Sequence, residues 1–267
     1  MTTDQTPFAA ELAVALEAAA EAAALLTARS GADAVREKAR ADLVTEVDEA
    51  SERAITARIR RHFPGDTVVA EEFAGSVQVS GRSWIIDPVD GTANYVHGHP
   101  FACVSIAFLD EAGPAAAVIH APFLGEVYEA TRGGGVRLNG KPITVSAVES
   151  GAGSLLATGF PFKEGKGDPA TYFRLVADVM LSAHDIRRAG SAALDLAFVA
   201  AGRHDGYFEI GVAPWDIAAG ILLVTEAGGR VTGWPADAAD PLRTGRILAT
   251  NGRIHRWLEE KVSGYGL

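Results

Sequence analysis

The stretch Trp84–Tyr95, WIIDPVDGTANY, decides the fold, because an apolar strand here runs directly into acids, a proline and a glycine. Pro88 fixes φ and lacks an N–H donor, so we expect the strand to end there. The turn Asp90–Thr92 is typical of a helix start, whose free backbone N–H groups bind anions. Asp87 and Asp90 on this corner therefore suit a hard divalent cation beside an anion.

A structural interpretation of the same residues stays open. Asp87 would then be a turn residue and Asp90 a helix N-cap, roles in which aspartate is common. The pair Glu71 and Glu72 also ends an apolar strand, and Asp216 stands at the start of a predicted helix, where it too would serve as an N-cap. Like charges brought together need cations between them, so these acids indicate a carboxylate metal site without defining a reaction.

The overall charge argues against one class of partner. The chain carries 24 Lys+Arg and 34 Asp+Glu in 267 residues, a formal net charge of −10, and its 48% of hydrophobic residues is typical of a globular protein. An acidic chain repels a bare phosphate backbone, so we expect no direct nucleic-acid binding. A chain of this charge that handles phosphates needs cations from solution.

Cysteine content and the first helix predict a cytoplasmic protein. Cys103 is the single cysteine and lies in an apolar run, which predicts a buried thiol in a reducing compartment and excludes an internal disulfide framework. The alanine-rich start is interrupted by Glu11, Glu17 and Glu21. It therefore predicts an amphipathic helix, and neither a membrane span nor a signal peptide.

The order of strands and helices predicts an α+β fold with two halves. Short β-type runs bounded by Gly, Pro or Asp fill the middle of the chain, and strands alternate with helices after about residue 150. We expect an antiparallel α+β half, residues 1–147, with most of the acids, and an α/β half, residues 148–267, with Asp216. Short connections predict that the halves pack tightly as one unit, with the site in their seam. Helices are predicted at residues 7–30, 171–182, 191–201 and 216–228, and a further helix is predicted to start after Thr45 or Asp48 and to end at Arg61.

These motifs resemble the inositol monophosphatase family of magnesium-dependent, lithium-sensitive phosphatases. The resemblance rests on residues 84–95 and on residues 215–220, WDIAAG, followed by Glu226–Gly229. The motifs occur in family order over roughly residues 9–229, and two long motifs together are highly specific. The resemblance implies a layered αβαβα sandwich of the sugar-phosphatase type. Supporting matches are DLVTEVD at 42–48, Glu71-Glu72, GSAAL at 190–194 and, as in the bacterial type, GFPF at 159–162 and Arg187-Arg188.

The resemblance implies a site with two or three Mg²⁺ ions. Glu71, Asp87 and the backbone carbonyl of Val89 would hold one ion. Asp87, Asp90 and Asp216 would hold a second, and Glu71 would share a weaker third. Oxygen ligands of this kind suit Mg²⁺, which neutralises the phosphate dianion and activates a water for direct attack.

The resemblance also assigns the catalytic and substrate-binding residues. The attacking water would be oriented by Asp48 and Thr92, with Glu71 as the third catalytic residue. The amides of Gly91 and Thr92 would hold the phosphate, and Glu209 would contact a sugar hydroxyl. The substrate-binding residues that it implies are Gly91, Thr92, Ala192, Glu209 and Asp216.

Three departures from the family pattern concern the edges of the site. Ala70 replaces a glycine that often precedes the glutamate pair, and Phe160 stands where animal enzymes carry a small polar residue near the substrate. The family has a lysine on a flexible loop close to position 42. Lys38 and Arg40 are both candidates for it, and exposed surface charge is the alternative for each.

The residues after the Asp-Gly-Thr turn favour one substrate class. Thr92–Tyr95, TANY, resembles the pattern of inositol monophosphatases, which favours inositol 1-phosphate and similar small polyol or sugar phosphates. Fructose-1,6-bisphosphatase and histidinol-phosphatase activities are the enzymatic alternatives. The family is usually homodimeric, so a homodimer is expected.

A non-catalytic role is the alternative from a different class. Some bacterial relatives bind the transcription machinery, and the basic surface for this would be Arg187, Arg188, Arg203 and His204. The competing interpretation is that these residues form salt bridges near the substrate or at a dimer face. The net charge of −10 favours the second interpretation.

Overall fold

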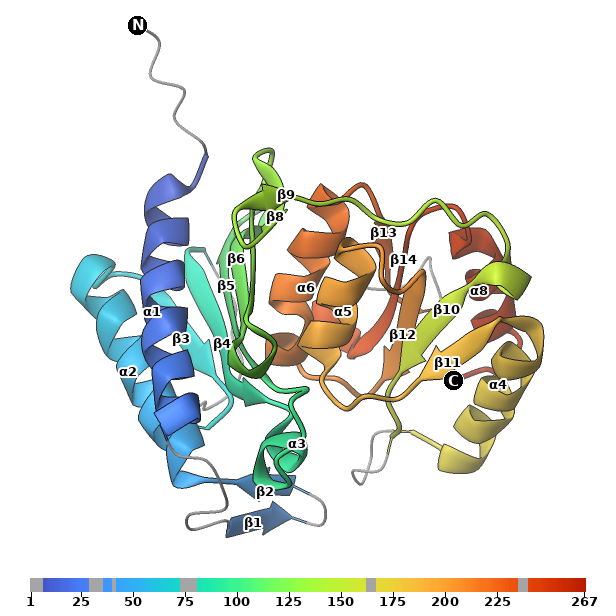
Figure 1. The fold of residues 1–267 in the computed structure, drawn as a ribbon, viewed down its shortest axis with the longest axis horizontal. Helices are drawn as coiled ribbons and strands as arrows, with labels where there is room; N and C mark the ends of the chain where they lie inside the picture. The colour runs from blue at the N-terminus through green and yellow to red at the C-terminus, as the bar shows by residue number, and fades with distance from the viewer. Residues whose placement is uncertain (1–6, 29–35, 40–41, 73–80, 162–166, 235–239) are drawn as a thin grey trace, which may run out of the picture.

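The structure is a computed structural model that describes residues 7–28, 36–39, 42–72, 81–161, 167–234 and 240–267. Five layers follow one another across it, namely two helices, a seven-stranded sheet, two helices, a five-stranded sheet and two helices (Figure 1). Three buried apolar clusters lie between these layers. The predicted α+β fold, a layered αβαβα sandwich, is confirmed.

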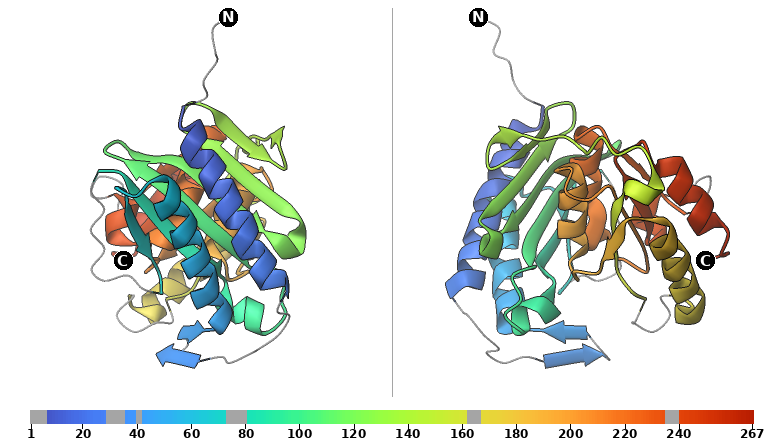
Figure 2. Two further views of the ribbon diagram at one scale, coloured as in Figure 1. Left: turned by 90° about the vertical axis from the view of Figure 1, so that its left-hand side faces the viewer. Right: turned by 45° about the vertical axis from the view of Figure 1, so that its right-hand side comes forward.

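Helices α1 (Ala9–Ala28) and α2 (Glu46–His62) form the first layer, across one face of the seven-stranded sheet (Figure 2). The buried side of α1 is mostly alanine, which lets the helix backbone approach the sheet closely. Helix α2 begins with a capping box: the Thr45 hydroxyl accepts from the Asp48 N–H, and the Asp48 carboxylate accepts from the Thr45 N–H. Of the helices described, none is long and apolar enough to cross a bilayer.

The seven-stranded sheet keeps its strands in chain order, β3 to β9. Only β3 and β4 pair in parallel, and the other neighbours are antiparallel. Cys103, in β5, is fully buried as predicted. The strands are β3 (Thr67–Ala70), β4 (Ser83–Asp90), β5 (Cys103–Asp110), β6 (Gly113–Ala121), β7 (Glu126–Thr131), β8 (Gly135–Leu138) and β9 (Lys141–Pro142).

The prediction that this strand ends at Pro88 is wrong, because β4 continues to Asp90. Asp87 pairs with Ser105 and Asp90 pairs with Cys103, so three steps along β4 match two along β5. The extra residue is a β-bulge, where a proline does not interrupt the ladder. Ser105 and Cys103 are two residues apart on β5 and therefore face the same side of the sheet. Because Asp87 and Asp90 pair with these two residues, both aspartates lie on one face.

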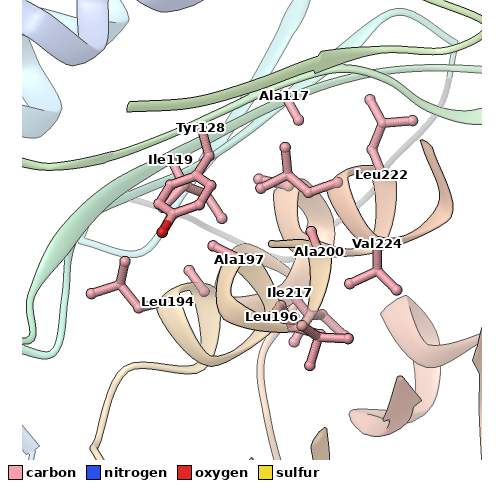
Figure 3. Packing of buried hydrophobic residues seen from close by; sticks show 14 of the residues in the cluster. Ala117, Ile119, Tyr128, Leu194, Leu196, Ala197, Ala200, Ile217, Leu222 and Val224 are labelled. Carbon is pink, nitrogen blue, oxygen red and sulfur yellow. The ribbon is translucent and has the colours of Figure 1, made fainter. Parts of the chain in front are cut away.

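Helices α5 (Ala192–Ala200) and α6 (Pro214–Glu226) form the middle layer. Their apolar side chains meet those of the seven-stranded sheet, as Figure 3 shows for Leu194 and Ala197 opposite Ile119 and Tyr128. The two helices lie very close together at Gly220. A Cβ there would be 2.4 Å from a Cδ of Leu196, so only glycine fits this crossing.

The five-stranded sheet has the order β11-β10-β12-β14-β13. Strand β10 is parallel to β11 and β12, while β14 is antiparallel to β12 and β13. Helices α4 (Pro169–Ser182) and α8 (His255–Ser263) cover its outer face (Figure 1). The strands are β10 (Leu155–Thr158), β11 (Asp185–Arg187), β12 (Gly206–Ile210), β13 (Arg230–Thr232) and β14 (Arg246–Thr250).

Both large sheets respect the predicted halves, one lying within residues 67–142 and the other within residues 155–250. The boundary at 147/148 itself stays a prediction. The remaining elements are β1 (Arg36–Ala39), β2 (Asp42–Val44), α3 (Thr92–Val96), α7 (Pro241–Thr244) and the 3-10 turns Pro122–Leu124 and Gly151–Gly153.

Replacing Gly220 by alanine is expected to lower the free energy of unfolding by about 2 kcal/mol, because the added methyl group overpacks the α5–α6 crossing. Urea denaturation followed by circular dichroism measures this loss. Gly65→Ala is the matched control, since a Cβ at Gly65 meets nothing within 4 Å. The control is expected to change stability by less than about 0.5 kcal/mol. Equal effects of the two substitutions would contradict the packing argument.

Candidate metal centre

Three aspartates from distant parts of the chain meet at one point. Asp87 and Asp90 lie at the end of β4, and Asp216 lies in the first turn of α6. One carboxylate oxygen of each lies within 4.8 Å of the others. Asp87 and Asp90 are buried and Asp216 is half-buried. The sequence pattern placed these aspartates at the end of a strand and at the start of a helix, and the fold brings these two positions together.

Hydrogen bonds hold two of the three carboxylates to the backbone beside them. Asp87 Oδ1 accepts from the Val89 N–H at 3.0 Å, within the β4 bulge. Asp216 Oδ2 accepts from the Ala213 N–H at 2.6 Å. Pro214 is the first residue of α6, so Asp216 is at the third helical position and is not the N-cap. The N-cap alternative for Asp216 is therefore wrong.

Asp90 ties the end of β4 to the start of α5. Its Oδ2 accepts from the Ser191 hydroxyl at 2.6 Å and from the Ala193 N–H at 2.7 Å. Ser191 is the N-cap of α5, and Gly91, not Asp90, occupies the N-cap position of α3. The N-cap alternative for Asp90 is also wrong. The contact with Ser191 was missed because no local pattern relates residues 101 positions apart.

Burial and mutual repulsion disfavour negative charge at this centre. Burial raises the pKa of Asp87 well above its usual value, and the charges of Glu71, Asp90 and Asp216 raise it further. Burial and the charge of Asp216 raise the pKa of Asp90 to about 7, although its hydrogen bonds from Ser191 and the α5 backbone act in the opposite direction. All three donors are oxygens, which is the set that Mg²⁺ prefers, so the residues present fit this ion.

The two other predicted ligands flank the three aspartates. Glu71 follows β3 and is half-buried. Its charge raises the pKa of Asp87, although Glu71 is not one of the three residues whose carboxylate oxygens lie within 4.8 Å of one another. Val89 is buried in the bulge, and its carbonyl oxygen lies 3.1 Å from the Thr92 hydroxyl, as an alternative acceptor to Asp48 for the single hydroxyl proton.

Asp48 and Thr92, the predicted water-orienting pair, are in contact. The Thr92 hydroxyl lies 3.2 Å from Asp48 Oδ1, which it can reach as a donor. Asp48 Oδ2 accepts from the N–H of Thr45 at 2.9 Å and from its hydroxyl. Burial raises the pKa of Asp48, and the hydrogen bonds from Thr45 and Thr92 counteract part of this shift. Thr45 was not predicted, although its T-x-x-D spacing is a capping-box signal.

Gly91 forms the corner between β4 and α3. Its φ of +95° is in the left-handed region, and a Cβ there would be 2.9 Å from the Phe101 carbonyl oxygen. Glycine is therefore required at this corner. The Asn94 side chain fixes the corner by donating to the carbonyl oxygens of Phe101 at 2.7 Å and Ala189 at 2.8 Å.

Glu209 lies on β12, and Ala192 is the first residue of α5. The Tyr207 hydroxyl donates to Glu209 Oε2 at 2.5 Å. Burial raises the pKa of Glu209 to about 7. The charge of Asp216 adds to this upward shift, and the hydrogen bond from Tyr207 counteracts part of it. Gly159 makes room for this carboxylate, because a Cβ there would be 2.0 Å from Glu209 Oε1. Tyr207 and Gly159 were not predicted as its neighbours.

The basic residues considered for a binding surface have acidic or apolar surroundings. Arg187 pairs with Asp185 at 2.5 Å, and Arg203 pairs with Glu126 at 2.7 Å. His204 is buried. The salt-bridge interpretation therefore holds for both arginines. For the flexible-loop lysine, Arg40 and the side chain of Lys38 lie outside the described residues.

Comparisons with known proteins agree with this geometry. The model of the inositol monophosphatase family matches residues 9–266. The inositol-1-monophosphatase of Synechocystis sp. is 44% identical over 231 residues, which cover 86% of this chain and 80% of that protein. The Nus factor SuhB of Escherichia coli is 45% identical over 215 residues, which cover 80% and 79%. The solved structure of inositol monophosphatase from Anabaena (Nostoc) sp. gives a TM-score of 0.85 at 40% identity and covers 96% of both chains.

Mg²⁺ is expected to raise the melting temperature more at pH 8 than at pH 5. The pKa of Asp90 is about 7 in the folded protein and about 4 in the unfolded chain. The metal-free protein therefore becomes less stable as pH rises from about 4 to about 7, because the folded state loses a proton that it binds more tightly than the unfolded state does. The ion replaces the lost protons. At saturating Mg²⁺ and pH 8, we expect a gain of about 5 °C by differential scanning fluorimetry, and less than about 2 °C at pH 5.

Asp87→Asn removes one repelling charge and one ligand, so this variant is expected to lose most of the Mg²⁺-dependent gain. The control is Glu111→Gln, which changes an exposed acid in the β5–β6 turn and should behave like the unmodified protein. An equal gain at both pH values, or an unchanged gain in Asp87→Asn, would count against a metal centre at these aspartates.

Proposed function

The chain belongs to the inositol monophosphatase family, and from this premise we propose that it hydrolyses inositol 1-phosphate and similar polyol monophosphates. Metal-dependent hydrolysis of phosphate monoesters is the activity of the family. The observation that carries the proposal is the convergence of Asp87, Asp90 and Asp216 at the end of β4, which joins a cation site to the corner at Gly91.

We propose that two or three Mg²⁺ ions bind at this centre. Glu71, Asp87 and the Val89 carbonyl would hold one ion, and Asp87, Asp90 and Asp216 a second, with Glu71 near a weaker third. Supporting this assignment, the charges of Glu71, Asp90 and Asp216 all raise the pKa of Asp87. When bound, the ions supply positive charge against the phosphate dianion and lower the pKa of a water.

Asp48 and Thr92 are proposed to orient the attacking water. The Thr92 hydroxyl can donate to Asp48 and still accept a hydrogen bond from water, which directs a water lone pair toward the phosphorus. The raised pKa of the buried Asp48 carboxylate makes it a better proton acceptor than an exposed aspartate. Thr45 fixes Asp48 from the opposite side and so keeps Oδ1 directed at Thr92. Glu71 completes the proposed catalytic set.

The phosphate is proposed to bind at the backbone N–H groups of Gly91 and Thr92, where α3 begins. On the leaving-group side, Glu209 accepts hydrogen bonds from polyol hydroxyls, with Asp216 and Ala192 beside it. The half-buried Glu209 is held by Tyr207, so its second oxygen is available for a hydroxyl. A neutral polyhydroxyl group is the chemistry that matches such an acceptor.

We further propose a cytoplasmic homodimer. The single cysteine, Cys103, is buried and suits a reducing compartment. The dimer is proposed from family membership.

Asp87→Asn is expected to reduce turnover of inositol 1-phosphate by at least about 10³-fold at saturating Mg²⁺, because it removes a charge shared by both proposed ion sites. Phosphate release from four substrates tests the substrate class: inositol 1-phosphate, fructose 1,6-bisphosphate, histidinol phosphate and adenosine 3′,5′-bisphosphate. The first is expected to have the highest kcat/KM. Preference for either of the last two would refute the ranking, and activity retained by Asp87→Asn would refute the ligand assignment.

A binding role in transcription is the second candidate, and the name of the Escherichia coli relative, a Nus factor, favours it. The ion pairs of Arg187 and Arg203 argue against a free basic surface at these residues. A pull-down with Asp87→Asn separates the two roles, because a binding role does not require turnover. Retention of RNA polymerase by this inactive variant would support the second role, and no retention by either protein would remove it.

A further inference from the structure

Two carboxylates, Asp195 of α5 and Glu209 of β12, interact electrostatically, and we call them the acidic pair. Asp195 lies in the first turn of α5 and is 2% exposed. Its Oδ1 has no hydrogen-bond partner among the described residues and lies 3.9 Å from Nδ1 of the buried His204, whose pKa burial lowers to about 4. Burial raises the pKa of Asp195 well above its usual value, and the charge of Glu209 raises it further. A nearby positive charge counteracts these shifts, because it favours the ionised form of each carboxyl group.

Arg188 is the cation that reaches both members of this pair. It lies between β11 and α5, and its guanidinium lies 5.4 Å from the centre of the Phe160 ring. Its charge opposes the rise in pKa that burial causes at both Asp195 and Glu209. The guanidinium therefore lies within electrostatic range of both carboxylates.

Close contacts at Gly190 place Arg188 near the phosphate corner. A Cβ on Gly190 would lie 2.8 Å from Arg188 Nη1 and 3.2 Å from Asn94 Nδ2, so the guanidinium approaches the side chain that fixes the corner. Phe160, the ring over which Arg188 lies, follows Gly159, where a Cβ would be 2.0 Å from Glu209 Oε1. The Arg188 guanidinium therefore lies close to the phosphate corner, and its aromatic neighbour adjoins the residue that packs against Glu209.

The aromatic support keeps the guanidinium in place. Phe160 packs against Phe173 of α4 with ring centres 5.1 Å apart, and Arg188 lies over the Phe160 ring. A guanidinium stacks on an aromatic ring and keeps its charge at all relevant pH values, whereas an ammonium would lose the planar contact. Phe160 stands where the animal enzymes carry a small polar residue, and its ring packs against the Arg188 guanidinium.

We propose that Arg188 is a specificity-determining residue, which offsets the negative charge of the acidic pair so that the site accepts an uncharged polyol. This inference rests on the proposed function and names the charge class of its leaving group. Without the guanidinium, the two carboxylates would favour a leaving group that carries an ammonium ion. With it, the negative charge is balanced and hydroxyl groups are bound through hydrogen bonds to Glu209.

The test compares inositol 1-phosphate, which has a neutral leaving group, with histidinol phosphate, which has a cationic one. In Arg188→Gln, the ratio of kcat/KM for histidinol phosphate to that for inositol 1-phosphate is expected to rise about 10-fold. For inositol 1-phosphate the loss is expected in KM, with kcat within about threefold, because the reacting atoms lie at the aspartates. Arg188→Lys keeps the charge and is expected to hold the ratio within about threefold of the unmodified enzyme.

Arg187→Gln is the matched control, since Arg187 is the adjacent, exposed arginine and pairs with Asp185 at 2.5 Å. Its substrate ratio is expected to stay within about twofold of the unmodified enzyme. Melting temperatures of all variants verify folding. Suppose that the unmodified enzyme hydrolyses inositol 1-phosphate and that Arg188→Gln and Arg187→Gln have the same ratio of kcat/KM values for the two substrates. The inference about Arg188 is then overturned, and the proposed function is not. If the unmodified enzyme hydrolyses neither substrate, the proposed function is overturned and this inference with it.

Discussion

Repulsion among buried carboxylates is the constraint on which the rest of the site depends. Asp87, Asp90 and Asp216 have oxygens within 4.8 Å of one another, and burial makes negative charge costly at Asp87 and Asp90. The fold holds them by fixed backbone groups: the β4 bulge for Asp87, the start of α5 for Asp90 and the start of α6 for Asp216. Protons or cations between the carboxylates would relieve this repulsion.

The middle helix layer connects this chemistry to the packing. Helices α5 and α6 cross closely at Gly220, and each presents its N-terminal turn to the end of β4. The apolar cluster in Figure 3 fixes both helices against the seven-stranded sheet. A small shift of either helix would therefore change the spacing of the aspartates, because the packed layer and the carboxylates belong to the same rigid elements.

The α+β order of elements could be predicted from hydrophobic runs and turn residues, and the layered sandwich was implied by the family resemblance of two specific motifs. Three of the predicted acids, Asp87, Asp90 and Asp216, do come together. The path of β4 through Pro88 could not be predicted, since a bulge depends on pairing with β5. Asp216 was placed at an N-cap because Pro214 was not recognised as the helix start. The contacts of Asp90 with Ser191 and of Arg188 with Phe160 join distant segments, so no local pattern reveals them.

The dispersion of the aspartates along the chain has a consequence for biosynthesis. When the ribosome has released only the seven-stranded sheet, Asp87 and Asp90 already share one face of β4. The Ser191 hydroxyl, the Ala193 N–H and the third carboxylate are synthesised about a hundred residues later. A nascent chain therefore lacks the third aspartate of the candidate metal centre until α6 has been synthesised.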